Sequence, residues 1–336
     1  MIPRLPNAAW LIAGVPVVLA LAGASYQAAG NHLDAKRSPE LGLLVNAGGL
    51  HLRLNCTGQG SPTVILESGL GDLGNEWRRV QPEIAKRSRV CSYDRAGYGG
   101  SEAGTMPRTS RQIATELHTL LRNAGEMPPF VLVGHSFGGF NVRVYNSQYP
   151  NQVAGLVLVD SVQEDQYELL PAAWEKISSE LLKRYQNQAT WAPIFIDMGV
   201  ARLMLQARKL RGSPGGLDES TYLLLQSKYL KARASELDSI KVSAQQAREA
   251  GDAGDKPLIV LTAGKYSDDI LRDGLSKRDL DEFQRIWVHD LQMRLARLSS
   301  RGERIIVSDS GHDIPLERPG AIMSAIEKVQ TAAGYQ

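Results

Sequence analysis

The stretch "FVLVGHSFGGF", residues 130–140, constrains the fold of this chain more than any other. The apolar run 130–134 predicts a strand that is covered on both faces. The pattern G-x-S-x-G follows at once, and 140–150 has the composition of a helix that ends before Pro150. A strand that reverses sharply into a helix strains the serine backbone and leaves its side chain exposed above the sheet edge. Ser136 is therefore a candidate nucleophile.

Strand-like and helix-like segments alternate on both sides of this turn. Strands are predicted at 50–55, 63–68, 89–94, 153–160, 257–264 and from 304 onward, and helices at 76–88, 110–125, 279–299 and 318–332. This alternation predicts an α/β core around a mostly parallel sheet flanked by helices.

One long segment interrupts the alternation. Residues 163–256 contain no comparable strand and read as helices, so we expect a helical cap inserted into a core of residues 31–162 and 257–336. We expect most apolar side chains of the insertion to pack within the cap and a minority to line an apolar acyl site; they are Leu169, Leu170, Trp174, Trp191, Phe195, Met198, Leu203 and Met204.

Residues 1–30 differ from the rest of the chain. No charged residue stands between Leu5 and His32, and the most apolar part, 8–24, is at the short end of what spans a bilayer. Ala22-Gly23-Ala24 reads as a signal-peptide cleavage site. We expect a signal peptide, with membrane association through residues 8–24 as the alternative. Either places the catalytic domain outside the cytoplasm, as an exported (periplasmic or secreted) or membrane-anchored protein.

The charge of the chain argues against a polyanionic partner. The net charge is +2, from 38 basic and 36 acidic residues, and no basic stripe is present, so we expect no nucleic-acid binding. The sequence contains no C-x-x-C, H-E-x-x-H or EF-hand pattern, so neither a metal site nor a cofactor is predicted.

A serine nucleophile needs a base. Of the six histidines, His312 stands in a loop between the last predicted strand and the last helix. Such loops gather at the carboxyl edge of a parallel sheet, where the serine turn also lies. His312 is therefore the predicted base. His135 adjoins the serine on the other side of the turn and is interpreted as structural.

Several motifs in order carry a family resemblance: "ESGLG" (67–71), "YDRAGYGGS" (93–101), "GHSFGG" (134–139), "LVLVDS" (156–161) and "SGH" (310–312). The chain from Leu50 to Ala332 resembles the esterase- and lipase-like serine hydrolases of the α/β-hydrolase fold. The resemblance implies an oxyanion hole made by the backbone N–H groups of Leu70 and Phe137. Where members often carry His-Gly, this chain has Ser68-Gly69, which changes little because the donor is a main-chain amide.

The resemblance allows two positions for the acid that orients His312. The commoner one follows the strand at 257–264, where Asp268 stands one place later than the usual spacing. The other is the end of the strand at 153–160, where Asp160 stands. A carboxylate closing an apolar strand needs a partner, which an imidazolium would provide. We favour Asp160; Asp313 directly follows the base and is not expected to fold back onto it.

The resemblance also implies that the strands carrying Cys56 and Cys91 are neighbours. In an oxidising compartment the two cysteines would form a disulfide.

Together these features predict a serine hydrolase that cleaves a carboxylic ester, or a related acyl bond, of a small and partly apolar molecule. Dehalogenases and epoxide hydrolases of this fold use an aspartate where this chain has Ser136. Two alternatives remain open: a non-catalytic ligand-binding protein on the same fold, and an interfacial lipase if the N-terminus stays in the membrane.

Overall fold

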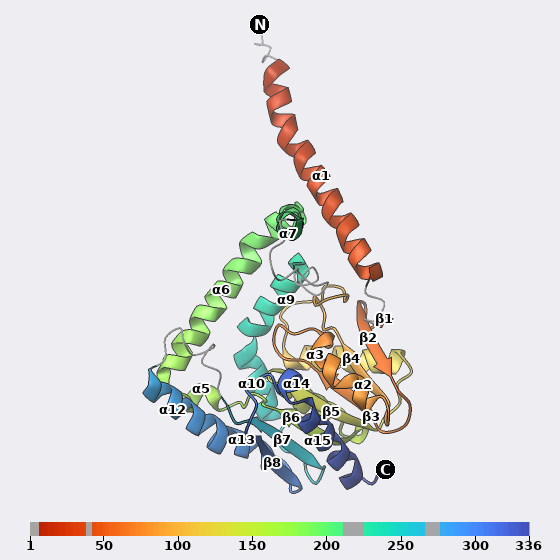
Figure 1. Ribbon diagram of the computed structural model, residues 1–336, viewed down its shortest axis with the longest axis vertical. Helices are drawn as coiled ribbons and strands as arrows, with labels where there is room; N and C mark the ends of the chain where they lie inside the picture. Colours follow the sequence, from red (N-terminus) through yellow and green to blue (C-terminus); the bar gives the residue numbers. More distant parts are fainter. Residues whose placement is uncertain (1–6, 38–41, 211–224, 266–275, 336) are drawn as a thin grey trace.

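The central sheet of the protein has eight strands and is mostly parallel, as the sequence predicts. The structure, a computed structural model, describes residues 7–37, 42–210, 225–265 and 276–335. The strand order is β1-β2-β4-β3-β5-β6-β7-β8, in which β1 and β2 are antiparallel to their neighbours and all other pairs are parallel (Figure 1). The bounds are β1 Leu43–Asn46, β2 His51–Thr57, β3 Thr63–Glu67, β4 Val90–Tyr93, β5 Phe130–His135, β6 Val153–Val159, β7 Leu258–Ala263 and β8 Gly302–Val307.

Helices cover both faces of this sheet, and the central strands are therefore buried along their whole length. One apolar core joins the sheet to α3 (Ser110–Asn123), α4 (Gly138–Gln148), α10 (Ile240–Glu249) and α13 (Gln292–Ala296). The other joins it to η2 (Gly74–Arg79), α2 (Gln81–Ile84), α14 (Ile314–Glu317) and α15 (Pro319–Ala332). Because the strands from β4 to β8 are parallel, their carboxyl ends lie at one edge of the sheet.

Between β6 and β7 the chain leaves this core and forms a layer of helices. These are α5 (Gln166–Leu169), α6 (Ala172–Asp197), α7 (Val200–Leu210), α9 (Ser227–Asp238) and α10. Figure 1 shows that α6 extends away from the sheet toward α7 and that α9 lies between α6 and the core. We call α5 to α10 the cap; after α10, β7 rejoins the sheet next to β6.

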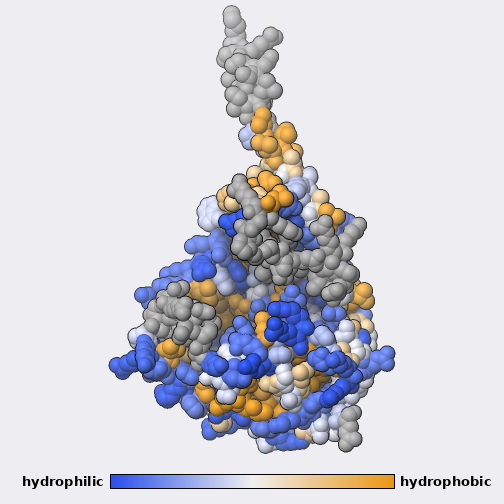
Figure 2. Space-filling model, viewed as in Figure 1, coloured by the Kyte–Doolittle hydropathy of each residue, from blue (hydrophilic) through white to orange (hydrophobic). Residues whose placement is uncertain are grey.

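A long helix, α1 (Asn7–Arg37), extends from the molecule and touches the far end of the cap (Figure 1). The Arg202 guanidinium on α7 donates to Gln27 Oε1 (3.0 Å), Asn31 Oδ1 (2.8 Å) and Asp34 Oδ2 (2.7 Å) on α1. Toward its N-terminus, α1 exposes apolar side chains, including those of Val18 and Leu19, and Figure 2 shows an orange segment there. Among the residues that the structure describes, no helix combines the length and hydropathy that a bilayer span requires.

One local expectation from the sequence is wrong, and one strand is missing from it. The single helix predicted over 76–88 is instead the 3₁₀ helix η2 followed by the short α2, because Pro82 opens a new helix in the middle of that range. The edge strand β1 is missing from the sequence-based prediction: three of its four residues are apolar, but the strand is short and its side chains are mostly exposed.

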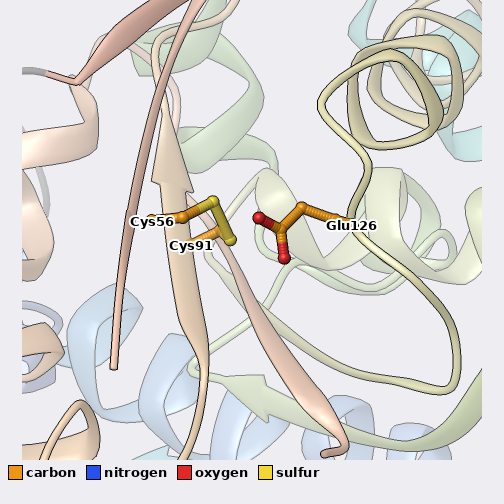
Figure 3. Close-up of side chains that lie close together, drawn as sticks. All are labelled: Cys56, Cys91 and Glu126. Carbon is orange, nitrogen blue, oxygen red and sulfur yellow. A yellow bond between two sulfur atoms is a disulfide. The ribbon is translucent and has the colours of Figure 1, made fainter. Parts of the chain in front are cut away.

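The two cysteines face each other across antiparallel strands. Cys56 on β2 pairs in register with Cys91 on β4, and their sulfur atoms are joined in a disulfide (Figure 3). Glu126, whose carboxylate points toward the disulfide in Figure 3, forms an ion pair with Arg89 just before β4. The bridge therefore ties β2 to the parallel part of the sheet.

Candidate functional site

Ser136 lies on the sharp turn between β5 and α4. Its φ angle is +51°, in the left-handed region that costs a residue with a side chain of order 1–3 kcal/mol. The neighbouring glycines make this turn possible. A Cβ on Gly134 would lie 2.7 Å from the carbonyl oxygen of Gly138, and one on Gly138 would lie 2.6 Å from that of Glu67. The turn leaves no room for a side chain at positions 134 and 138, which explains why the motif has glycine two residues before and two residues after the serine.

Asp160 stands at the end of β6, on the neighbouring strand, and also has a positive φ of +38°. Its side chain is almost fully buried. One carboxylate oxygen, Oδ1, accepts hydrogen bonds from the backbone N–H of Ala263 and from Trp287 Nε1, both at 3.0 Å. These two donors fix the carboxylate and leave its other oxygen for a third partner.

That partner is His312, on the loop between β8 and α14. Its Nδ1 lies 2.6 Å from Asp160 Oδ2. The carboxylate accepts this bond, so it favours the tautomer with the proton on Nδ1 and a free lone pair on Nε2. The His312 side chain is 34% exposed. A histidine held in this way can take up a proton at Nε2 and have the resulting charge stabilised at Nδ1.

Ser136, Asp160 and His312 all line one cavity of about 370 Å³ between the core and the cap. No hydrogen bond among the described residues joins Ser136 to His312, and catalytic hydrogen bonds of this kind often tighten only when substrate binds. The lining is largely apolar, and its apolar side chains are Leu70, Phe137, Val162, Tyr167, Trp174, Leu181, Leu182, Leu237, Ile240, Phe283 and Trp287.

Leu70 and Phe137, whose backbone N–H groups are the predicted oxyanion donors, both line the same cavity. Neither N–H donates a hydrogen bond within the described part of the chain. Leu70 belongs to the segment that follows β3, and this segment passes close to the nucleophile: a Cβ on Gly69 would lie 3.4 Å from Ser136 Cβ. Two unpaired amide donors beside a serine are suited to bind a developing oxyanion.

A second histidine–carboxylate pair lies beside the first. The His135 side chain is 1% exposed; its Nδ1 forms an ion pair with Glu76, and its Nε2 donates to the main-chain oxygen of His312 at 3.0 Å. Burial lowers the pKa of His135, but the charges of Glu76 and Asp72 and the bond to His312 outweigh burial and raise this pKa to about 9. His135 is therefore an imidazolium at neutral pH, which fits the structural role predicted for it.

The two acidic partners of His135 respond in opposite ways. Burial raises the pKa of Glu76, but the adjoining imidazolium outweighs burial and lowers it overall. Burial, and then the charge of Glu76, raise the pKa of Asp72 to about 6. These three side chains could together ligate a cation, but the charge of His135 is already matched by Glu76.

The sequence also singled out two other aspartates and eight apolar residues of the cap. Asp268 lies outside the described residues, and Asp313 stands at the N-cap position of α14, where its side chain makes no capping hydrogen bond. In the cap, only Trp174 of the eight apolar side chains singled out above lines the cavity. Leu169 and Leu170 pack against the cluster around Phe283. The other five are exposed, so the expectation that most of the eight pack within the cap is wrong: Trp191, Phe195, Met198, Leu203 and Met204.

Sequence reasoning did not single out Trp287 or Glu76. Trp287 opens a π-helical turn between α12 (Lys277–Ile286) and α13, which carries its indole N–H to Asp160. A π-helical turn within a helix often marks a functional site, but the sequence pattern there is ordinary. Glu76 lies on η2, and the pairing with His135 joins segments that are distant in the sequence.

Residues 62–192 match the model of the alpha/beta hydrolase fold family. The uncharacterized protein YqjL of Bacillus subtilis is 31% identical over 279 residues, which cover 83% of this chain and 87% of YqjL. The chain belongs to the α/β hydrolase fold family.

Other similarities extend over different lengths. A probable transporter of Hormonema carpetanum, efuK, is 23% identical over 80% of this chain, but the chain spans only 39% of the length of efuK. A thermophilic esterase of Thermogutta terrifontis has a similar structure, with a TM-score of 0.60 and 19% identity over 86% of this chain and 97% of the esterase. At this identity the likeness shows the fold alone. The chain is a hydrolase-family protein with a cavity suited to a small molecule.

Proposed function

We propose that this protein is a serine hydrolase that cleaves a carboxylic ester, or a related acyl bond, through an acyl-serine intermediate. The observation that carries the proposal is the contact between His312 Nδ1 and Asp160 Oδ2, at 2.6 Å, in the cavity that also contains Ser136. Nucleophile, base and acid come from the ends of three elements, in the chain order Ser, Asp, His that this fold uses.

In this mechanism Ser136 Oγ attacks the acyl carbon while its proton passes to His312 Nε2. Asp160 stabilises the imidazolium, and the amides of Leu70 and Phe137 bind the oxyanion. The C–O bond to the leaving alcohol then breaks, and the alkoxide takes the proton from Nε2. Water then enters, gives a proton to His312 Nε2 and attacks the acyl carbon. The bond between this carbon and Ser136 Oγ breaks, Oγ takes the proton back from Nε2, and the acid is released.

The lining of the cavity supports a substrate with an apolar part. Aromatic and aliphatic side chains from both the core and the cap surround the space, and its volume of about 370 Å³ suits a small ligand. The cap also contributes charged side chains to the lining: Glu175, Asp238 and Lys241, of which Glu175 and Lys241 are paired across 3.4 Å. We therefore propose that the acyl or alcohol part rests against the cap.

A panel of p-nitrophenyl esters of increasing acyl length tests this function. The wild-type protein should hydrolyse short and medium chains, and Ser136→Ala should lower kcat about 10⁶-fold. A non-catalytic ligand-binding protein on the same fold would bind such molecules without turnover. No hydrolysis by correctly folded wild-type protein, on any ester of the panel, would contradict the proposal.

We further propose that the catalytic part of the chain works outside the cytoplasm. Two observations support this: the Cys56–Cys91 disulfide, which persists in an oxidising compartment, and the uncharged residues 8–24. The contacts of Arg202 with residues 27–34 lie beyond the Ala22–Ala24 cleavage pattern, so a processed protein would keep them.

The mass of the mature N-terminus, measured on protein expressed in its own host, tests the location. Loss of the first residues up to Ala24 supports export, and an intact N-terminus in the membrane fraction supports an anchor, as an interfacial lipase requires. An intact N-terminus in the cytosolic fraction, with Cys56 and Cys91 present as free thiols, would contradict this proposal.

A further inference from the structure

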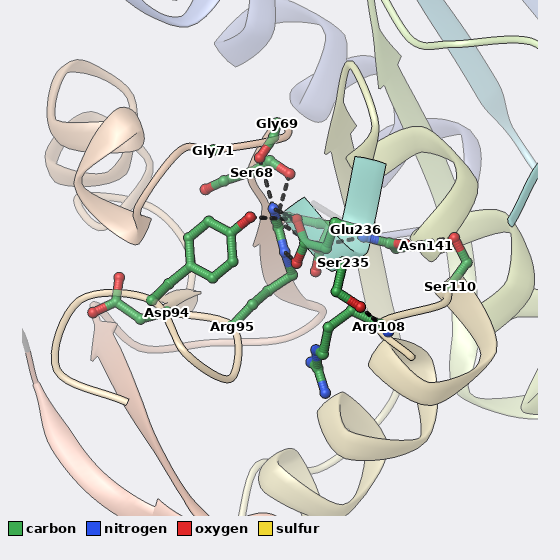
Figure 4. Close-up of polar contacts among 12 residues, drawn as sticks. Ser68, Gly69, Gly71, Asp94, Arg95, Arg108, Ser110, Asn141, Ser235 and Glu236 are labelled. Atoms are coloured by element: carbon green, nitrogen blue, oxygen red, sulfur yellow. Dashed lines mark hydrogen bonds and ion pairs between the residues drawn. The ribbon is translucent and has the colours of Figure 1, made fainter. Parts of the chain in front are cut away.

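The segment after β3 that carries Leu70 is held in place mainly by side chains. We call residues 68–71 the oxyanion loop. Arg95 Nη1 donates to the carbonyl oxygen of Ser68 (2.8 Å), and Arg95 Nη2 donates to that of Gly69 (2.7 Å). The hydroxyl of Tyr229 donates to the carbonyl oxygen of Gly71 (2.9 Å). Arg95 thus contacts two successive carbonyls of the loop (Figure 4).

Helix α9 of the cap fixes the guanidinium of Arg95. Glu236 on α9 accepts two hydrogen bonds from Arg95, at Nε (2.8 Å) and Nη2 (2.9 Å), and Figure 4 shows the two side chains meeting beneath the loop. Tyr229 lies two turns earlier on the same helix and therefore on the same face. One face of a cap helix consequently reaches the oxyanion loop at two points, directly and through Arg95.

This contact is fully buried, which makes it rigid. The side chain of Arg95 is 2% exposed and that of Glu236 is 0% exposed, and Glu67 at the end of β3 also pairs with Arg95, at 3.1 Å. A bidentate guanidinium–carboxylate pair has a defined orientation, and removing one partner leaves an uncompensated buried charge. The remaining N–H groups of Arg95 are therefore held toward the loop.

The direction of a carbonyl determines the direction of the next amide. The peptide group between Gly69 and Leu70 is planar, and in a trans peptide the oxygen and the amide hydrogen point to opposite sides. Because Arg95 holds the oxygen of Gly69 on one side, the N–H of Leu70 points to the other. Arg95 also lies 5.7 Å from the ring centre of Phe137, the residue that carries the second proposed donor.

We propose that the cap, through Tyr229, Glu236 and Arg95, positions the Leu70 N–H of the oxyanion hole, so that the cap is part of the catalytic geometry as well as a wall of the substrate cavity. These three are positioning residues, and none lines the cavity. The inference rests on the proposed function. It predicts that loosening α9 lowers kcat, because the oxyanion forms only in the transition state, with little change in KM.

Two variants with matched controls test the inference. Glu236→Gln removes the charge from the pair with Arg95. Its control is Glu116→Gln, which makes the same change in the buried Arg108–Glu116 pair, where both side chains are at most 4% exposed and neither contacts the oxyanion loop. Tyr229→Phe removes one hydroxyl and is expected to fold even if Glu236→Gln does not. Its control is Tyr145→Phe, whose hydroxyl bonds to Gln152 away from the site.

On the best ester of the panel, we expect kcat to fall about tenfold or more in Glu236→Gln and about threefold to tenfold in Tyr229→Phe, with KM within about twofold. Both controls should keep the wild-type kcat, even where thermal denaturation shows that they lose stability. Equal losses of kcat in the variants and their controls, or wild-type kcat in Tyr229→Phe, would overturn the inference. If the wild-type enzyme itself does not turn over esters, the proposed function fails instead.

Discussion

Two histidine–carboxylate pairs lie next to each other in this protein, and they differ in what surrounds them. The rings of His135 and His312 are 4.8 Å apart between centres. His312 pairs with a carboxylate that two other donors already fix, and a third of its side chain is exposed in the cavity. His135 is buried, pairs with Glu76 and uses its second nitrogen to hold the main chain of His312.

The comparison shows that a histidine paired with a carboxylate is not necessarily able to exchange a proton with a ligand. Both imidazoles have an acidic partner, but only His312 has a ring nitrogen free to exchange a proton with a group in the cavity. Both nitrogens of His135 are occupied, and its charge supports the structure around the turn. A base is therefore recognised by the nitrogen that remains free, and a pKa raised to about 9 at His135 marks a structural cation.

The largest expected effect separates the two acids. Asp160→Asn should lower kcat about 10⁴-fold with the fold intact, because an amide in place of the carboxylate favours the wrong tautomer of His312. Glu76→Gln should lower kcat less than tenfold, because a glutamine oxygen can still accept the bond that Glu76 Oε2 accepts from the Gly69 N–H of the oxyanion loop (3.2 Å). It should reduce the free energy of unfolding by about 3 kcal/mol, because it breaks a buried ion pair. Ester kinetics and chemical denaturation of both variants measure the difference.

The comparison would fail if the two variants behaved alike. Equal losses of kcat would mean that His135 takes part in the proton transfer. A full wild-type rate in Asp160→Asn would return attention to Asp268 as the acid.

The next effect concerns the dependence of stability on pH. The pKa of His135 is about 9 in the folded protein, against 6.5 for an unperturbed histidine. Its contribution to stability is therefore complete below about pH 6.5 and is lost as the pH rises through about 9. Asp72, with a pKa of about 6, changes stability in the same direction but between about pH 4 and 6.

Denaturant unfolding of the wild type at pH 6.5 and pH 9.5 should show this loss, and Glu76→Gln should show a smaller loss over the same interval. A wild-type protein that is more stable at pH 9.5 than at pH 6.5 would contradict the charge assigned to His135.

The smallest expected effect concerns the second donor to Asp160. Trp287→Phe keeps a ring in the cluster with Phe283 but removes the indole N–H from Asp160 Oδ1. Because the Ala263 amide still holds the same oxygen, we expect kcat to fall only about threefold to tenfold, which is about 1 kcal/mol and less than a hydrogen bond to a charged group contributes when it is the only one. Steady-state kinetics would measure it, and an unchanged kcat would show that the backbone donor alone orients Asp160.

The sequence predicted the fold and the serine turn because both depend on local patterns. Apolar runs and glycine spacing reveal β5 and the reversal at Ser136, and the chain order of motifs indicates the sheet. The contacts that the sequence does not reveal are those between segments far apart in the chain. The ion pair between Glu76 and His135, and the contact of Arg95 with Glu236 on α9, depend on how the cap and core pack, and no spacing of residues encodes that packing. The break at Pro82 is visible in the sequence, because proline favours the first turn of a new helix.

The central claim is that Ser136 is an activated nucleophile, and one measurement tests it most directly. The protein is treated with a fluorophosphonate, and the adduct is located by mass spectrometry of the peptides. The account predicts one equivalent of label on Ser136, no label in Ser136→Ala, and much slower labelling in Asp160→Asn. Undiminished ester hydrolysis by a protein whose Ser136 stays unlabelled, or equal labelling of Ser136→Ala, would contradict it.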